Sequence, residues 1–183
     1  MAFRFTKLKL RGVILIESDL FRDARGSLVE VHNNKVFRKN GINAEFVQDL
    51  VAVSKKNVLR GLHYQLKPNA QAKLVSVISG RIFDVCVDMR RSSKTYSKWI
   101  GVELSEANRR MLMVPEGFAH GYLALEDSRV MYKIAGEYSK PDSRGVAWND
   151  PELGIRWPAT GPIIASDTDR AWPGLKDADN NFH

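Results

Sequence analysis

Apolar and polar residues alternate with a period of two along ten short segments, which leaves little of the chain for helices. Such alternation places one side of a strand against a core and the other side toward solvent. Turn signals, among them Arg25-Gly26, Ser79-Gly80 and Glu126-Asp127-Ser128, separate the segments at short intervals. The pattern predicts an all-β sandwich or barrel, with strands over 3–10, 13–17, 27–31, 46–53, 73–78, 81–88, 99–104, 110–114, 121–125 and 129–134.

The rest of the chain adds one short helix and a distinctive tail. A helix is predicted over 36–40, with Gly41 as its C-terminal cap. Three of the four tryptophans and four of the seven prolines follow residue 147, so we interpret this last part as a tail packed over the sheet. Because 183 residues fit one hydrophobic core and no repeat or linker is evident, 1–183 is predicted to be a single domain.

Charge and hydropathy narrow the class of protein. Lys and Arg number 28 against 21 Asp and Glu, and the net charge of +7 is compatible with an anionic ligand, either a phosphate ester or a nucleic acid, without choosing between them. The cations are spread along the chain without a zinc-finger or RNA-recognition motif, which argues against a nucleic-acid partner. The longest early apolar run, 13–16, is too short for a membrane span or a signal peptide, so we expect a cytoplasmic protein without a membrane partner.

Two histidines lie in glycine-containing segments that resemble turns, and both are candidate site residues. Arg60 and His63 are three residues apart around Gly61, so an anion-binding group and a proton acceptor are expected to face one cavity. His120 lies in the second segment, before Gly121. The alternative interpretation is that each histidine is hydrogen-bonded within the sheet.

The second of these segments, Pro115-Glu116-Gly117-Phe118-Ala119-His120, resembles the second motif of the cupin fold, a small barrel whose mouth often holds a metal. The first cupin motif is only half present, because Gln65 and Ala70 stand where a metal cupin offers a histidine and a glutamate. A metal site in which Glu30 or Asp84 completes a triad with the two histidines is an alternative that these residues leave open.

A longer series of blocks resembles the dTDP-4-dehydrorhamnose 3,5-epimerases over nearly the full length of the chain. The resemblance implies a cupin-type double-stranded β-helix, that is, a jelly-roll barrel with a few short helices. It further implies N-terminal strands exchanged in a homodimer, a C-terminal tail packed over the barrel, and neither a metal nor an organic cofactor. The blocks are 23–26, 46–49, 58–65, 73–75, 84–90, 115–121, 132–133, 148–151, 155–158 and 166–169.

The implied reaction converts dTDP-4-dehydro-6-deoxy-D-glucose, a nucleotide-linked 4-keto sugar, into dTDP-4-dehydro-L-rhamnose. A ketone at C4 acidifies the protons on C3 and C5, so the enzyme needs a base on one face of the sugar, an acid on the other and a cation near the ketone oxygen. By resemblance, His63 is the base, Tyr132 the acid and Lys73 the cation. Asp169 matches the carboxylate that pairs with the base, which would orient the imidazole and stabilise its charged form.

The resemblance also implies substrate-binding roles and shows three departures. Leu50, Ser143 and Thr168 differ from the residues that the family often has, and all three map to nucleotide or substrate contacts rather than to the acid–base pair. A related mono-epimerase or ketoisomerase, a metal-dependent cupin oxygenase, and a non-catalytic sugar-binding or nucleic-acid-binding module are therefore kept as alternatives. The residues with implied binding roles are Arg60 for phosphate, His120 for sugar and phosphate, Arg25 and Glu30 for the nucleotide across a dimer, Gln48 for the base, and Tyr138 for stacking on the base.

Overall fold

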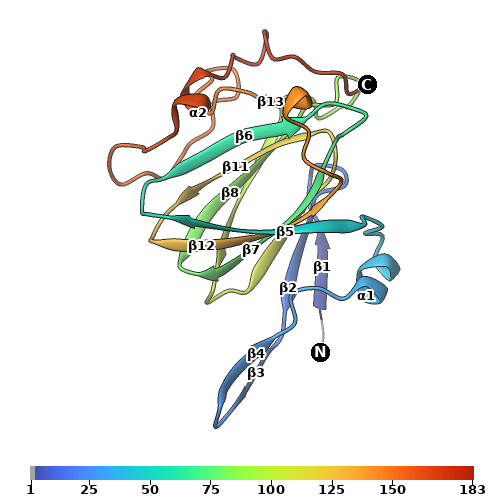
Figure 1. The fold of residues 1–183 in the computed structure, drawn as a ribbon, viewed down its shortest axis with the longest axis vertical. Coiled ribbons are helices and arrows are strands. Elements are labelled where there is room, and N and C mark those ends of the chain that lie inside the picture. Colours follow the sequence, from blue (N-terminus) through green and yellow to red (C-terminus); the bar gives the residue numbers. More distant parts are fainter. Residues whose placement is uncertain (1–2) are drawn as a thin grey trace.

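The computed structural model describes residues 3–183, which form two facing antiparallel sheets and a projecting hairpin (Figure 1). The larger sheet, in the order β1-β2-β10-β7-β12-β5, contains Phe3–Lys7, Ile14–Ser18, Arg110–Val114, Ala72–Ser79, Ser128–Ala135 and Phe46–Ser54. The smaller sheet, in the order β13-β6-β11-β8-β9, contains Ser143–Gly145, Leu59–Gln65, Phe118–Ala124, Arg81–Asp88 and Trp99–Ser105. The predicted all-β jelly-roll architecture with a few short helices is confirmed.

Alternating side chains on the strands build separate apolar layers. On β8, Cys86 is buried between the two sheets together with Val75 of β7. The adjacent Val85 and Val87 point to the opposite face of the same strand and pack with Phe182 of the C-terminal segment. The smaller sheet is therefore covered on both faces, which explains why its central strands contain so few exposed positions.

Strand β6 was not predicted, and β11 was predicted only from Gly121 onward, because the segments around Gly61 and Gly121 were interpreted as turns. The structure places His63 within β6 and His120 within β11, so neither histidine lies in a turn. Gly61 and Gly121 lie against each other, and a Cβ atom added to Gly61 would come within 2.5 Å of the Gly121 Cα atom. Here the glycines permit a close approach of two strands at a β-bulge instead of a chain reversal.

The helices are short, and the first lies close to its predicted position. Helix α1, Asn34–Lys39, starts two residues earlier than expected because the Asn33 side chain accepts a hydrogen bond from the Val36 amide at 3.2 Å. Gly41 follows the helix with a φ of +83°, in agreement with its expected role at the C-terminal end. No helix within residues 3–183 is long and apolar enough to cross a membrane.

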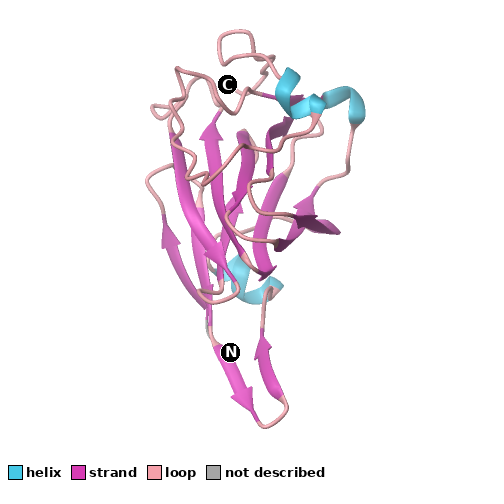
Figure 2. Ribbon diagram, turned by 90° about the vertical axis from the view of Figure 1, so that its left-hand side faces the viewer, coloured by secondary structure: helices cyan, strands magenta, loops and turns pink. Residues whose placement is uncertain are grey.

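A hairpin of β3, Leu20–Asp23, and β4, Gly26–Val29, projects from the barrel (Figure 2). The Arg25-Gly26 turn joins its strands as predicted, with a φ of +129° at Gly26. The sequence pattern predicted only the second strand of this pair, because 20–23 is too short for its alternation to stand out. Among residues 3–183, the hairpin strands pair with each other and with neither sheet of the barrel.

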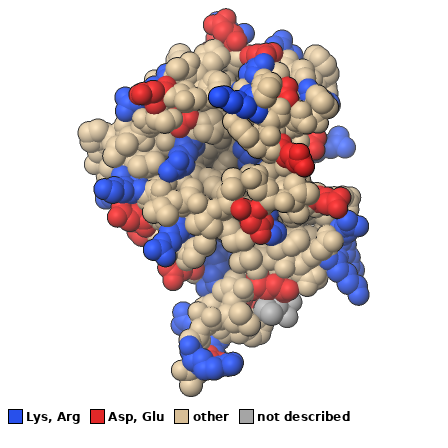
Figure 3. Space-filling view, in the orientation of Figure 1, with Lys and Arg blue, Asp and Glu red and all other residues tan. Residues whose placement is uncertain are grey.

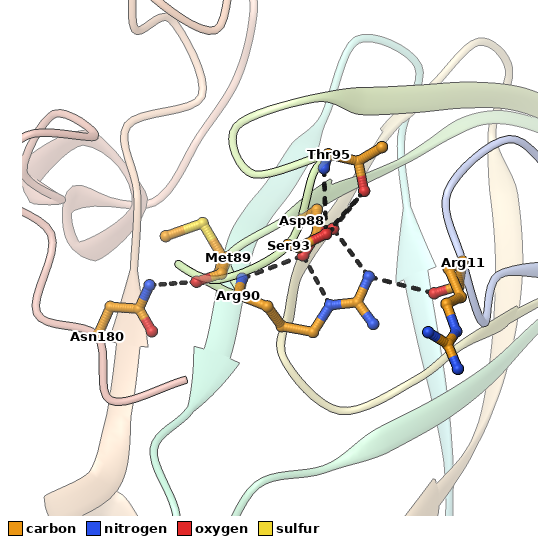
Figure 4. A network of polar contacts seen from close by, with 7 residues as sticks. All are labelled: Arg11, Asp88, Met89, Arg90, Ser93, Thr95 and Asn180. Atoms are coloured by element: carbon orange, nitrogen blue, oxygen red, sulfur yellow. Dashed lines mark hydrogen bonds and ion pairs between the residues drawn. The ribbon is translucent and has the colours of Figure 1, made fainter. Parts of the chain in front are cut away.

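After the short helix η1, Lys140–Asp142, and strand β13, the chain continues as the C-terminal segment. This segment lies over the smaller sheet and contains α2, Asp167–Ala171. A polar network anchors its end (Figure 4). Asp88, at the end of β8, accepts hydrogen bonds from Arg90, Ser93 and Thr95 at 2.6–2.8 Å. Asn180 donates to the Met89 carbonyl oxygen next to it. This network ties the tail to the end of the barrel.

Candidate active site

A cavity of about 550 Å³ lies between the two sheets, a volume typical of sites for small molecules. Strands β5, β7 and β12 form one wall, β6 and β11 form the opposite wall, and α2 lines a third side. Figure 3 shows a hollow on this face of the molecule, with several Lys and Arg side chains at its border. The titratable side chains that line the cavity are Arg60, His63, Tyr64, Lys73, His120, Tyr132, Tyr138 and Asp169.

His63 and Asp169 form a hydrogen-bonded pair at the cavity wall. The Nε2 atom of His63, on β6, contacts the carboxylate of Asp169, and the Ser166 hydroxyl accepts a bond from the Asp169 amide at 3.1 Å. Burial raises the pKa of Asp169, but the hydrogen bond from His63 and further bonds outweigh it and hold this pKa below its usual range. Because a carboxylate only accepts, the shared proton belongs on Nε2, which leaves Nδ1 of His63 free to take a proton.

A second histidine–carboxylate pair lies deeper and faces a lysine. The Nε2 atom of His120 contacts Asp84 Oδ1 at 2.8 Å, and both side chains are buried. Burial raises the pKa of Asp84 against the opposing effect of His120. Lys73 on β7 is desolvated, and this lowers its pKa to about 8, while the charge of Asp84 acts in the opposite direction. The ammonium of Lys73 is therefore poised between its charged and neutral forms near neutral pH.

Tyr132 lies on the wall opposite His63. It belongs to β12 of the larger sheet, and its ring centroid is 6.1 Å from that of His120. Burial raises the pKa of Tyr132 well above its usual value, and the neighbouring Tyr122 phenol adds to this effect. The Tyr132 phenol therefore keeps its proton at neutral pH and is available as a donor.

The structure brings seven of the ten predicted site residues to this cavity. The four with predicted catalytic roles are joined by Arg60, His120 and Tyr138. The Arg60 guanidinium donates to the Ser54 hydroxyl at 3.0 Å, and Tyr138 is 64% exposed at the rim. This group combines an acceptor, a donor and two cations around one cavity.

The other three predicted site residues are not among the cavity-lining residues. Gln48 lies on the same strand face as Leu50, a lining residue, but further toward the start of β5. Arg25 is at the tip of the projecting hairpin, where it forms an ion pair with Asp23 at 2.5 Å. The Glu30 side chain accepts a hydrogen bond from Asn33. Their predicted nucleotide contacts stay predictions.

Several lining residues were outside the predicted set or were named only as departures. Leu50, Ser143 and Thr168, the three departures from the family pattern, all line the cavity. Ser166 and Trp172 line it as well. Neither has a predicted role, because Asp169 and Thr168 are the only tail residues that the family resemblance relates to the site. Residues on an irregular segment reach a site through tertiary contacts, and periodicity carries no signal for these.

The metal alternative rested on Glu30 or Asp84 as a third ligand. Glu30 lies next to the hairpin and accepts a hydrogen bond from Asn33. Asp84 is hydrogen-bonded to His120, whereas His63 is hydrogen-bonded to a different carboxylate, that of Asp169. Within residues 3–183, no three side chains of His, Cys, Asp or Glu gather in a metal-binding arrangement.

A jelly-roll barrel with a cavity between its sheets, lined by a histidine–carboxylate pair on one side and a buried tyrosine on the other, has the architecture of a cupin-type enzyme. The chain belongs to the dTDP-4-dehydrorhamnose 3,5-epimerase family, whose model matches residues 7–177. The predicted family membership is thereby confirmed, and with it the prediction of an epimerase.

One relative and two solved structures illustrate the likeness. The dTDP-4-dehydrorhamnose 3,5-epimerase of Methanothermobacter thermautotrophicus is 46% identical, and the alignment covers 96% of each chain. The dTDP-6-deoxy-D-glucose-3,5-epimerase of Legionella pneumophila, solved with dTDP-4-keto-L-rhamnose, is 37% identical with a TM-score of 0.94, covering 97% of this chain and 95% of that one. A 3'-monoepimerase from Streptomyces bikiniensis, solved with dTDP-quinovose, is 30% identical with a TM-score of 0.87, covering 92% and 86%.

Proposed function

We propose that the protein epimerises dTDP-4-dehydro-6-deoxy-D-glucose at C3 and C5 to give dTDP-4-dehydro-L-rhamnose, through an enolate and by acid–base catalysis. The observation that carries this proposal is the placement of His63 and Tyr132 on opposite walls of one cavity. A sugar ring held between the two sheets presents one face to each residue. Inversion at carbon requires an acceptor on one face and a donor on the other, because the proton leaves from one face and a proton is returned to the opposite face.

Each inversion proceeds in two proton transfers. His63 takes the proton from carbon through Nδ1, and the electron pair of the broken C–H bond moves into the C4 ketone to form an enolate. Lys73, as a cation, stabilises the negative charge on the enolate oxygen. Tyr132 then donates its proton to the opposite face of the carbon, and solvent restores both side chains. The same steps at the second carbon complete the isomerisation without any net redox change.

The remaining cavity residues supply the binding energy. Arg60 offers a guanidinium fork that suits a diphosphate, and its bonds to Ser54 and Val53 fix its direction. The exposed ring of Tyr138 at the rim is placed to stack on the nucleotide base, and His120 lines the inner part of the cavity. Location in the cytoplasm stays a prediction.

The direct test of this function is the stereochemistry of the product. Purified protein is incubated with dTDP-4-dehydro-6-deoxy-D-glucose, the product ketone is reduced chemically, and the configuration at C3 and C5 is read by NMR. We expect inversion at both carbons. Inversion at C3 alone would assign the chain to the single-centre reaction named for the Streptomyces bikiniensis enzyme, and an unchanged sugar would contradict an epimerase of this substrate.

The pH dependence of kcat/KM should reveal Lys73. The protonated lysine is the active form, so activity falls as pH rises through the Lys73 pKa of about 8. One unit above that pKa the cation fraction is about a tenth, and the rate drops about tenfold. Tyr132 does not produce this limb because its pKa is raised well above 10.0. Lys73→Arg should be slower but lack the limb, whereas an identical limb in that variant would assign it to another group.

We further propose that the protein is a homodimer formed through the hairpin and β5. Phe21 and Leu28 of the hairpin are 46% and 61% exposed, and Val53 on the edge strand β5 is 68% exposed. Exposed apolar side chains on an edge strand are a common route to pairing with another chain. A second copy would also explain the predicted roles of Arg25 and Glu30, which do not line their own cavity.

Light scattering after size-exclusion chromatography tests the dimer. We expect a mass of about twice 20.7 kDa for the unmodified chain. Leu28→Asp should yield a folded monomer because no hairpin residue belongs to the core clusters of the described chain. Ser92→Asp, at an exposed position on the β8–β9 connection, is the charge-matched control, since it also adds one negative charge. A monomer at micromolar concentration of the unmodified chain would overturn this proposal.

A further inference from the structure

Helix α2 contacts His63 with two different side chains. Asp169 within the helix bonds the Nε2 atom of His63, and Trp172, the residue that ends the helix, meets the imidazole edge-on. The ring centroids of His63 and Trp172 are 6.1 Å apart, at an interplanar angle of 70°. The carboxylate fixes one nitrogen of the base, whereas the indole borders the ring itself.

The backbone beside His63 is shaped to receive the indole. Gly145 on β13 is the cross-strand partner of His63 on β6. A Cβ atom added to Gly145 would come within 2.4 Å of Trp172 Cδ2, so the indole lies directly on this glycine. The space that any other residue would fill is occupied by Trp172, and the indole is thereby held next to the base.

The chain on the far side of Trp172 is also fixed. The Pro173 carbonyl oxygen accepts a hydrogen bond from the Ala147 amide at 2.8 Å, and the Leu175 amide donates to Asp150 at 2.8 Å. The indole nitrogen of Trp172 is buried and has no hydrogen-bond partner among the described residues. The indole is therefore held by packing, and its effect on His63 depends on ring shape rather than on the N–H group.

We propose that Trp172 is a positioning residue for the base, which keeps the imidazole of His63 in the orientation that presents Nδ1 to the substrate. This proposal rests on the epimerase function proposed above. It assigns to the tail a task in the chemical step, beyond covering the barrel. A misplacement of about 1 Å in a reacting group lowers a rate by about 10²-fold, and removal of the indole leaves that freedom to His63.

Three variants test the proposal through the rate of deuterium entry at C3 and C5 in D₂O, with the affinity for dTDP measured separately. Trp172→Ala should lower the exchange rate by about 10- to 100-fold and leave the dissociation constant for dTDP within about twofold. Trp172→Phe should recover most of the rate, because the unpartnered N–H is not needed. Gly145→Ala retains Trp172 but pushes its indole away from His63, so its exchange rate should fall as in Trp172→Ala. Thermal melting identifies any variant that does not fold, and Trp172→Phe with Gly145→Ala then decide the question.

An unchanged exchange rate in Trp172→Ala or Gly145→Ala would overturn the proposal, as would a loss confined to dTDP affinity, which would make the indole a binding wall only. NMR of the His63 ring nitrogens provides a readout that needs no substrate. We expect their signals to broaden or shift in Trp172→Ala and Gly145→Ala but not in Trp172→Phe. If the unmodified protein exchanges no deuterium, the proposed function fails, whereas the NMR result still decides on the role of Trp172.

Discussion

Replacing His63 with alanine should lower kcat/KM by about 10²- to 10⁴-fold, the typical contribution of a positioned general base. The Nδ1 atom of His63 is the acceptor that the Asp169 contact leaves free, and among the described residues that line this wall His120 is the only other imidazole. His120 is 4% exposed and lies deeper than His63, beside Asp84, so it does not substitute for His63. Deuterium entry at both C3 and C5 should be lost together.

Binding should survive this change. Arg60 and Tyr138 hold the nucleotide part of the substrate in the proposed function, and neither contacts the His63 ring in the hydrogen-bond pattern. Calorimetric titration with dTDP should therefore give a dissociation constant within about threefold of the unmodified protein. His63→Gln, whose side-chain amide places an N–H near the position of Nε2 and can donate to Asp169, serves as the matched control for folding. Exchange of deuterium at an undiminished rate in either variant would refute His63 as the base.

Tyr132→Phe should separate proton removal from product formation. The variant still has His63 and Lys73, so the enolate forms and the same face is reprotonated from His63. Substrate recovered from D₂O should carry deuterium without inversion, while product formation falls by about 10²- to 10³-fold. The substitution leaves no buried polar group stranded, because the Tyr122 hydroxyl keeps its 2.8 Å contact with Ser54.

The role of Tyr132 is tested by the ratio of the rate of deuterium entry into the substrate to the rate of product formation. Mass spectrometry gives the deuterium content of the recovered substrate, and NMR of the same sample gives the product formed. Tyr122→Phe is the matched control, since it also removes a buried phenol next to the cavity but not the proposed donor. Equal losses of exchange and of product in Tyr132→Phe would contradict its assignment as the acid on the opposite face.

The sheets could be predicted because burial and chain direction impose a period of two on most strands. On 81–88, where Val85 and Val87 face the tail and Cys86 faces the other sheet, the mixed pattern still marks a strand. The β6 strand was lost because Gly61 looks like a turn residue in isolation. Gly61 is needed because its backbone lies against Gly121, sixty residues further along the chain, and a local sequence pattern does not reveal such a long-range contact.

In the site, too, some residues could be predicted from the sequence, and others depend on contacts between distant segments. His63, Lys73 and Tyr132 could be assigned from motifs of matching order, and the structure brings their side chains to one cavity. Trp172 could not, because its role depends on Gly145 and on the way the tail folds back. Arg25 does not line the cavity of its own chain. Its predicted nucleotide contact depends on a second copy of the chain.

Deuterium incorporation in D₂O tests the central claim most directly, namely that His63 and Tyr132 epimerise two carbons of one sugar through an enolate. The unmodified protein is incubated with dTDP-4-dehydro-6-deoxy-D-glucose, and NMR reads the label and the configuration at C3 and C5. We predict one deuterium at each carbon of an inverted product, and no label at either carbon with His63→Ala. Inversion without label from solvent, or label that persists in His63→Ala, would contradict the account.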